Sequence, residues 1–274
     1  MLVSLKEILN DISGKTVAVP AFNVYGYEDA AAIVEAAEEK RAPVILATNR
    51  DAINHMPVDI LGGILRNIGE NSSTKVCIHL DHGKTYEEAV SAIKSGYTSV
   101  MFDGSALSLN QNIEMTKEVV KLARAAKVSV EAEIGSVGYA DDGKDGEYTK
   151  LSEAIKFFSE TKVDALAVAV GTVHRMKSQV AKIDFELLQE IQDNIDVPLV
   201  IHGSSGVKNE DLKNLINYRV GKINIGTAIR MKFGGTLRDE IEKNHSEFDR
   251  IKLFKEPMKA VKEEAIEKFN LLGF

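Results

Sequence analysis

The chain has 274 residues, 44% of them hydrophobic and 27% charged, and it contains no tryptophan. Such a composition is ordinary for a globular protein and excludes a disordered or fibrous chain. The formal charge of −7 argues against a nucleic-acid partner, which would favour a strongly basic face. The length allows one large domain or two of ordinary size.

Two features bear on the compartment of the protein. No stretch approaches the roughly 20 apolar residues that span a bilayer, and the N-terminus lacks a basic leader followed by an apolar signal core. The single cysteine, Cys77, cannot form an internal disulfide and lies in an apolar run, so we interpret it as a small buried residue. We therefore expect a cytoplasmic protein without a membrane partner.

The chain opens with a predicted helix and continues with βα units. Ser4 and Glu7 fit a capping box, and the apolar residues from Leu5 to Ile12 share one helical face. Short β-branched runs then alternate with amphipathic helical patterns, which predicts a parallel sheet. Eight such runs occur, at residues 16–24, 43–48, 75–82, 99–105, 129–136, 165–172, 198–205 and 222–228.

Eight parallel strands with intervening helices favour one α/β fold, the (β/α)8 barrel, over a doubly wound open sheet. We expect a single barrel domain over residues 1–274 with a C-terminal helix over residues 259–270. The active sites of such barrels lie at the carboxyl ends of the strands. Polar side chains in those positions are therefore the first candidates for function.

Three of the six histidines, His82, His174 and His202, each stand just past an apolar run. One histidine beside a strand is more often a core or rim residue than a ligand, but three in equivalent positions favour a shared role. Three imidazoles suffice to hold a catalytic zinc, which keeps one coordination position open. We therefore predict a zinc site made by these side chains.

Carboxylates stand near these histidines. Asp81 directly precedes His82, although adjacent residues of an extended strand face opposite sides. Both reach one site only if the backbone turns at the strand end, and Gly83 favours such a turn; the alternative role of Asp81 is to cap the next helix. Asp103 and Glu133 fit a second metal position or partners of the metal-bound imidazoles, or else a charge-paired barrel interior.

The turns after the seventh and eighth runs are rich in glycine and hydroxyl groups. Residues 203–206 read Gly-Ser-Ser-Gly, and residues 224–227 read Asn-Ile-Gly-Thr. Loops in this position often bind phosphate through backbone N–H groups; a plain turn is the alternative. A metal, a phosphate site and an acid suggest a sugar phosphate whose carbonyl is polarised by a Lewis acid. No lysine stands at the carboxyl end of a predicted strand to form a Schiff base instead.

With these residues, the chain resembles the class II, metal-dependent ketose-bisphosphate aldolases of the fructose- and tagatose-bisphosphate aldolase family. The resemblance covers nearly the whole sequence. It rests on Ala-Phe-Asn-Val at 21–24, on Leu-Asp-His-Gly at 80–83, on Val-Glu-Ala-Glu-Ile-Gly at 130–135, and on the segments around His174 and His202. The Leu-Asp-His-Gly element followed by both later histidines is specific to this family.

The resemblance implies a role for each of these residues. The three histidines would hold zinc, with Asp103 and Glu133 available to an alternative metal position, and Asp81 would exchange the proton of the substrate's C4 hydroxyl. The residues that would hold the substrate, mainly its dihydroxyacetone phosphate portion, are Asn23, Gly203, Ser205, Asn224 and Thr227. A monovalent cation near the phosphate and a homodimer or homotetramer are also implied.

Two departures from the family pattern lie in loops. After the fifth run, Asp141 stands where a catalytic glutamate is expected, with Asp142 or Glu147 as alternatives. Arg175 replaces a glycine whose backbone helps to form the phosphate and cation site. We include Arg175 among the substrate-binding residues, because its side chain could contact phosphate; the alternative is that it points to solvent.

Two further departures lie near the C-terminus. The eighth run ends Thr227-Ala228, where the family has an acid after the threonine. Arg250 directly follows Asp249, without the proline that separates them in many members, whose arginine binds the distal phosphate. A ketose 1-phosphate is therefore a substrate class to weigh beside the 1,6-bisphosphate.

Three functions follow as hypotheses. The first is a zinc-dependent aldolase that reversibly cleaves a ketose phosphate into dihydroxyacetone phosphate and an aldehyde. The second is a metal-dependent sugar-phosphate isomerase or epimerase, which would use the same enediolate without breaking a carbon–carbon bond. The third is a barrel that binds a phosphorylated ligand without catalysis.

Overall fold

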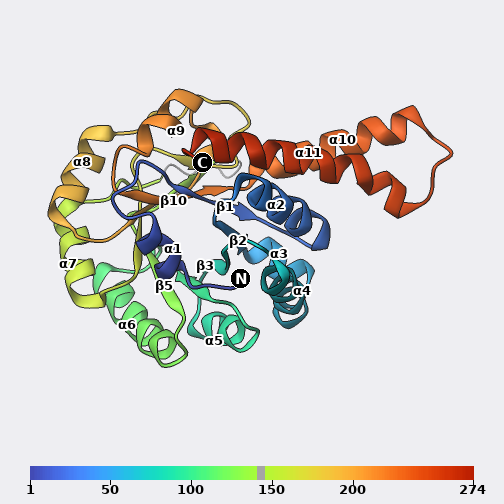
Figure 1. Ribbon diagram of the computed structural model, residues 1–274. Helices are drawn as coiled ribbons and strands as arrows, with labels where there is room; N and C mark the ends of the chain where they lie inside the picture. The colour runs from blue at the N-terminus through green and yellow to red at the C-terminus, as the bar shows by residue number, and fades with distance from the viewer. Residues whose placement is uncertain (141–145) are drawn as a thin grey trace.

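Eight parallel strands close into a barrel in the computed structural model, which describes residues 1–140 and 146–274 (Figure 1). The strands are β1 (Val19–Asn23), β2 (Val44–Thr48), β3 (Val76–Gly83), β4 (Ser99–Phe102), β5 (Ser129–Ile134), β7 (Ala165–Val168), β9 (Leu199–Ile201) and β10 (Val220–Ile225). The order around the barrel is β1-β10-β9-β7-β5-β4-β3-β2, and pairing of β1 with both β2 and β10 closes it. The fold is therefore the predicted (β/α)8 barrel.

Helices surround the barrel and follow its strands. They are α2 (Tyr27–Lys40), α3 (Arg50–His55), α4 (Val58–Asn71), α5 (Tyr86–Lys94), α6 (Leu109–Ala125), α7 (Leu151–Thr161), α8 (Phe185–Asn194), α9 (Asn209–Leu215), α10 (Thr227–Lys243) and α11 (Arg250–Leu271). Their apolar faces and the outward faces of the strands form one large buried cluster. Because parallel strands are covered on both faces, every residue of these eight strands is buried.

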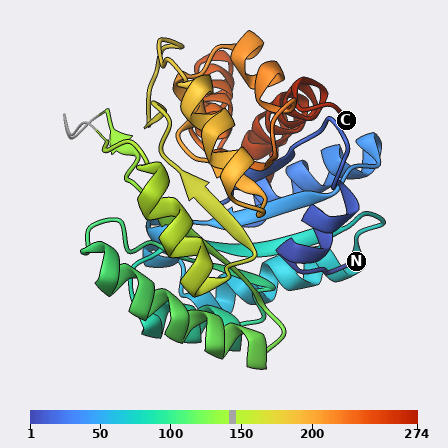
Figure 2. The same ribbon diagram turned by 90° about the vertical axis from the view of Figure 1, so that its left-hand side faces the viewer.

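The N-terminal helix α1 (Leu5–Asp11) closes one end of the barrel. Its predicted capping box is present, with Ser4 and Glu7 bonded reciprocally. The buried face of α1 packs against inward-facing strand residues, which include Val19, Cys77 and Met101. Figure 2 shows α1 on the same side of the molecule as both termini. The carboxyl ends of the strands, where the predicted site lies, are at the other end.

Three predicted strand ends were wrong in ways that affect the site. The seventh strand, β9, ends at Ile201 instead of residue 205, so Gly203 and Ser205 lie in the turn and short 3-10 helix that follow it. The sixth barrel strand, β7, ends at Val168 instead of residue 172, so His174 lies on a separate short strand, β8 (Val173–His174), which pairs with β6 (Gly138–Tyr139). Thr227 does not end a strand but begins α10. In each place a glycine, at position 171, 203 or 226, stands between the last residue of the strand and the predicted end.

The C-terminal part forms a long helical hairpin. Helix α11 begins at Arg250, nine residues earlier than the predicted start, and with α10 it projects from the barrel (Figure 1). The far end of α11 returns to the core, where the rings of Phe269 and Phe22 are 5.7 Å apart. Among the described residues, no helix has the length and apolarity needed to cross a membrane.

Candidate active site

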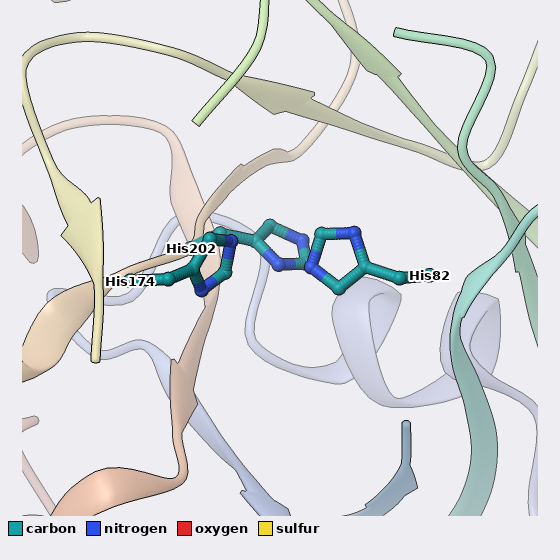
Figure 3. A group of neighbouring side chains, drawn as sticks. All are labelled: His82, His174 and His202. Atoms are coloured by element: carbon teal, nitrogen blue, oxygen red, sulfur yellow. The ribbon is translucent and has the colours of Figure 1, made fainter. Parts of the chain in front are cut away.

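The three predicted histidines come together at the carboxyl end of the barrel (Figure 3). His82 lies near the end of β3, His174 on β8, and His202 directly after β9. Their ring centroids are 4.6 to 5.9 Å apart, and one nitrogen of each lies within 4.8 Å of the others. Residues separated by 120 positions thus present their nitrogens to one point.

Carboxylates orient two of these imidazoles. His82 Nδ1 is 2.7 Å from Asp103 Oδ2, and His202 Nε2 is 2.9 Å from Glu131 Oε1. The other nitrogen of His82 and Nε2 of His174 are buried without a hydrogen-bond partner in the described structure. Buried nitrogens without partners are costly, and a metal ion accepts such lone pairs. The donor set therefore fits zinc, for which neutral imidazoles are common ligands.

The backbone at His82 solves the problem posed by two adjacent functional residues. His82 has φ +55°, a left-handed conformation that few residues other than glycine adopt, and the pairing register with β4 shifts between Leu80 and Gly83. The turn therefore lies at His82. The prediction that Gly83 provides this turn was wrong. Gly83 serves close packing instead, because a Cβ there would lie 2.8 Å from the Met101 carbonyl oxygen.

Because of this turn, Asp81 faces the same point as the histidines. Its Oδ1 atom is 4.0 Å from His82 Nε2 and 3.9 Å from His202 Nδ1. The amides of Asn23 and Asn224 donate to its two oxygens at 2.7 and 2.9 Å. Asp81 does not cap the next helix, because that cap is Thr85.

The electrostatic surroundings keep Asp81 ionised. Burial by itself would raise the pKa of this carboxyl, but the nearby His82, His202 and Lys222 hold the pKa well below its usual range. With two amide donors and no proton of its own, the carboxylate can accept a proton from a bound hydroxyl.

Asp103 and Glu133 form a second group with His82 whose ligand atoms also converge. Glu133 Oε2 is buried without a hydrogen-bond partner among the described residues, 3.9 Å from His82 Nδ1. Burial and the Asp103 carboxylate raise the pKa of Glu133 to about 8. Lys84, which sequence reasoning missed, donates to Asp103 at 2.6 Å and lines the pocket. The raised pKa of Glu133 reflects the cost of a second buried negative charge beside Asp103, a cost that a bound cation would relieve.

A buried ion pair next to the site was also not predicted from the sequence. Lys222 on β10 is fully buried and lies 2.9 Å from Glu131 Oε2, while Glu131 accepts from His202. His79 lies 3.6 Å from the same carboxylate. A lysine within a predicted buried strand is the sequence signal that could have revealed this pair, since lysine is rarely buried without a partner.

The two glycine-containing turns border the same pocket. Gly203 has φ +67°, and a Cβ there would lie 2.8 Å from the backbone of Val173, so the turn after β9 requires glycine. At the other turn, a Cβ on Gly226 would lie 2.7 Å from Asn23 Oδ1. Thr227 begins the 17-residue helix α10, whose N-terminal amides point to a site suited to an anion.

One pocket collects most of the predicted residues. Those that line it are Asn23, Asp81, His82, His174, Arg175, Gly203, Ser205, Asn224 and Thr227. Sequence reasoning missed other residues of its lining, among them Tyr25, Arg50, Asp51, Lys84, Tyr139 and Arg230. They lie on loops, on first turns of helices and, for Tyr139, on the two-residue strand β6, where no periodicity marks them.

The predicted residues in which the chain departs from the family pattern have different outcomes. Asp141 and the alternative Asp142 lie outside the described residues. Arg175 does not simply point to solvent: it has φ +60°, pairs with Asp51 at 2.9 Å and contributes to the pocket wall. Arg250 is not among the pocket residues, and it pairs with Glu28 at 2.8 Å on the surface.

A comparison with known protein families places this chain among the aldolases. The family model described as fructose-bisphosphate aldolase class-II matches residues 3–274, almost the whole chain. The chain belongs to the class II fructose-bisphosphate aldolase family. It is therefore a class II aldolase, a carbon–carbon lyase, and the histidine cluster lies at the end of the barrel where such enzymes carry their active site.

Solved structures agree with this placement. The aldolase superposes on the YdjI aldolase from Escherichia coli K12 with a TM-score of 0.87 and 32% identity, over 100% of this chain and 98% of that one. A putative fructose-1,6-bisphosphate aldolase from Coccidioides immitis gives a TM-score of 0.88 and 26% identity, over 98% and 95% of the two chains. The fructose-bisphosphate aldolase from Campylobacter jejuni shares the fold, with a TM-score of 0.84 at 20% identity over 99% and 95%.

Proposed function

We propose that this aldolase uses zinc held by His82, His174 and His202 to cleave a ketose phosphate reversibly into dihydroxyacetone phosphate and an aldehyde. The observation that carries the proposal is the convergence of three imidazole nitrogens beside the Asp81 carboxylate. When bound, zinc supplies a Lewis acid that polarises the substrate carbonyl and stabilises negative charge there.

Residues of the chain carry out the proton transfer and hold the groups that take part in it. Asp81, fixed by Asn23 and Asn224, accepts the proton of the C4 hydroxyl as the bond between C3 and C4 breaks, and returns it in the condensation direction. Because both amides hold the carboxylate, the proton acceptor is fixed before substrate arrives, which lowers the entropic cost of reaching the reactive geometry.

The phosphate of the dihydroxyacetone portion is held on the other side of the pocket. Gly203, Ser205 and Thr227 offer backbone N–H groups and hydroxyls at the turns after β9 and β10. Arg175 adds a positive charge to the same pocket.

Asp103 and Glu133 serve the alternative metal position, in which His82 is the shared ligand. The protein works as a homodimer or homotetramer in the cytoplasm, and a monovalent cation near the phosphate completes the site.

The test is release of dihydroxyacetone phosphate, coupled to a reporter enzyme, from a panel of ketose 1-phosphates and 1,6-bisphosphates. We expect release that a chelator abolishes and zinc restores. His174→Ala should lose zinc retention and lower kcat by a factor of about 1,000 or more, because a ligand is missing. His245→Ala, at an exposed histidine far from the pocket, is the matched control and should behave as wild type.

Two outcomes would contradict the proposal. Full activity of a metal-free His174→Ala variant would remove zinc from the reaction. Stoichiometric zinc without release from any panel member would favour an isomerase if the sugar phosphate is interconverted, or a non-catalytic barrel if it is only bound. The preferred panel member shows whether the distal end of the substrate carries a phosphate.

A further inference from the structure

The third zinc ligand is held differently from the other two. His82 and His202 are each oriented by a carboxylate, as the second ring nitrogen of a metal-bound histidine normally is. Within the described residues, the ring of His174 makes no hydrogen bond. It stacks instead on the ring of Tyr139, with centroids 4.6 Å apart and an angle of 22° between the planes.

The backbone fixes this stack in place. Tyr139 and His174 are direct partners in the two-stranded parallel sheet of β6 and β8, and the N–H of Ala140 donates to the His174 carbonyl at 3.1 Å. Tyr139 is thus the point at which the segment after β5 meets the metal site. Direct partners on paired strands hold their side chains close together, so the backbone keeps the Tyr139 ring beside His174.

A second contact adds to the position of the tyrosine ring. The guanidinium of Arg175 lies 5.6 Å from the centroid of the Tyr139 ring, within the range of a cation–π interaction. Arg175 also bonds Asp51 at 2.9 Å. Its φ of +60° breaks the alternation of an extended strand, and this allows consecutive residues, His174 and Arg175, to contact the same ring.

We propose that Tyr139 is a positioning residue for the zinc ligand His174, and that the stack couples the segment after β5 to zinc binding. The inference rests on the proposed zinc site. Tyr139 acts through His174 and needs no contact with the reacting atoms. Its aromatic ring, not its hydroxyl group, performs this role.

The first test is zinc affinity, measured by competition with a fluorescent chelator. Tyr139→Ala should raise the Kd for zinc about ten-fold, the size expected for losing an aromatic pair behind a metal ligand, while Tyr139→Phe stays within about two-fold of wild type. Tyr148→Ala removes an exposed tyrosine of the same connecting segment and should leave the Kd unchanged. Equal melting temperatures of the metal-free proteins establish that the fold is intact.

The second test follows the coupling in the other direction. Linkage requires that zinc stabilise the stack as much as the stack stabilises zinc. Zinc should therefore slow hydrogen exchange of the Ala140 amide in wild type and in Tyr139→Phe, and have no such effect in Tyr139→Ala.

Several results would overturn the inference. It fails if the zinc Kd of Tyr139→Ala stays within two-fold of wild type, if Tyr139→Phe loses as much affinity as Tyr139→Ala, or if zinc protects Ala140 equally in all variants. A wild-type protein that binds no zinc overturns the proposed function as well. Wild-type zinc binding with an unaffected Tyr139→Ala variant overturns only the role of Tyr139.

Discussion

At the scale of single residues, the site depends on backbone conformations that glycine usually provides. His82 and Arg175 have φ of +55° and +60°, each at a cost of about 1 to 2 kcal/mol for a side chain with a Cβ. In both places the turn lets two consecutive side chains serve one site: Asp81 with His82, and His174 with Arg175. The sequence shows these residue types, but it does not reveal their positive φ angles, because neither side chain favours this backbone conformation.

Cys77 gives a prediction at the same scale. It is fully buried, and burial raises the pKa of its thiol to about 12. Because the thiolate is the nucleophile, the folded protein at pH 8 should fail to react with a chromogenic disulfide reagent, while the protein in guanidinium reacts at once. Ser246→Cys, at an exposed position, is the control and should react rapidly when folded. Equal rates for native and unfolded Cys77 would show that the barrel opens far more readily than its packing implies.

At the scale of elements, the local patterns located the strands and helices more reliably than the ends of these elements. The capping box of α1 formed as predicted, since its signal is local and reciprocal. The ends of the sixth, seventh and eighth predicted strands were wrong, because residue types along the chain do not mark the last hydrogen bond of the strand ladder. The short strand β8, which carries His174, exists only through its pairing with β6, and neither strand has a pattern of its own.

Helix α8 provides a test of local capping. The Asp184 side chain accepts a hydrogen bond from the Leu187 N–H at 2.9 Å. Asp184→Ala should lower the free energy of unfolding by about 1 kcal/mol, because the N-terminal amide loses its acceptor. Chemical denaturation measures the change, with Glu190→Ala on the exposed face of the same helix as control. A loss no larger than that of the control would mean that the cap contributes nothing here.

At the scale of the whole molecule, the protein has two apolar cores in different parts of the fold. The larger lies between the strands and the outer helices. The smaller lies inside the barrel, where α1 seals the end opposite to the active site. Between the smaller core and the site lie the buried charges of Glu131 and Lys222, so the barrel interior changes from apolar to ionic toward the carboxyl ends of its strands.

A substitution at Ile8 tests how much the packing of α1 against the barrel contributes to stability. Its side chain is fully buried in the smaller core, so Ile8→Ala should lower the free energy of unfolding by about 2 to 5 kcal/mol through loss of burial and creation of a cavity. The kcat for ketose phosphate cleavage should remain that of wild type at temperatures where the variant is folded, because α1 lies at the opposite end of the barrel. Asn10→Ala on the exposed face of α1 is the control. A fall in kcat without a fall in stability would contradict the inference that α1 contributes to stability and not to catalysis.

The sequence by itself determined the barrel, the class of chemistry and the residues of the pocket that stand directly after strands. It could do so because strand alternation, helical periodicity and ligand chemistry are carried by residue type and spacing. Only the tertiary structure decided which ring nitrogen of His82 and of His202 meets a carboxylate, that Asp81 and His82 share one side, that Lys222 pairs with Glu131, and that Tyr139 stacks on His174. These depend on backbone turns and on contacts between segments far apart in the chain, and the free energy of such contacts is set by packing that no local pattern records.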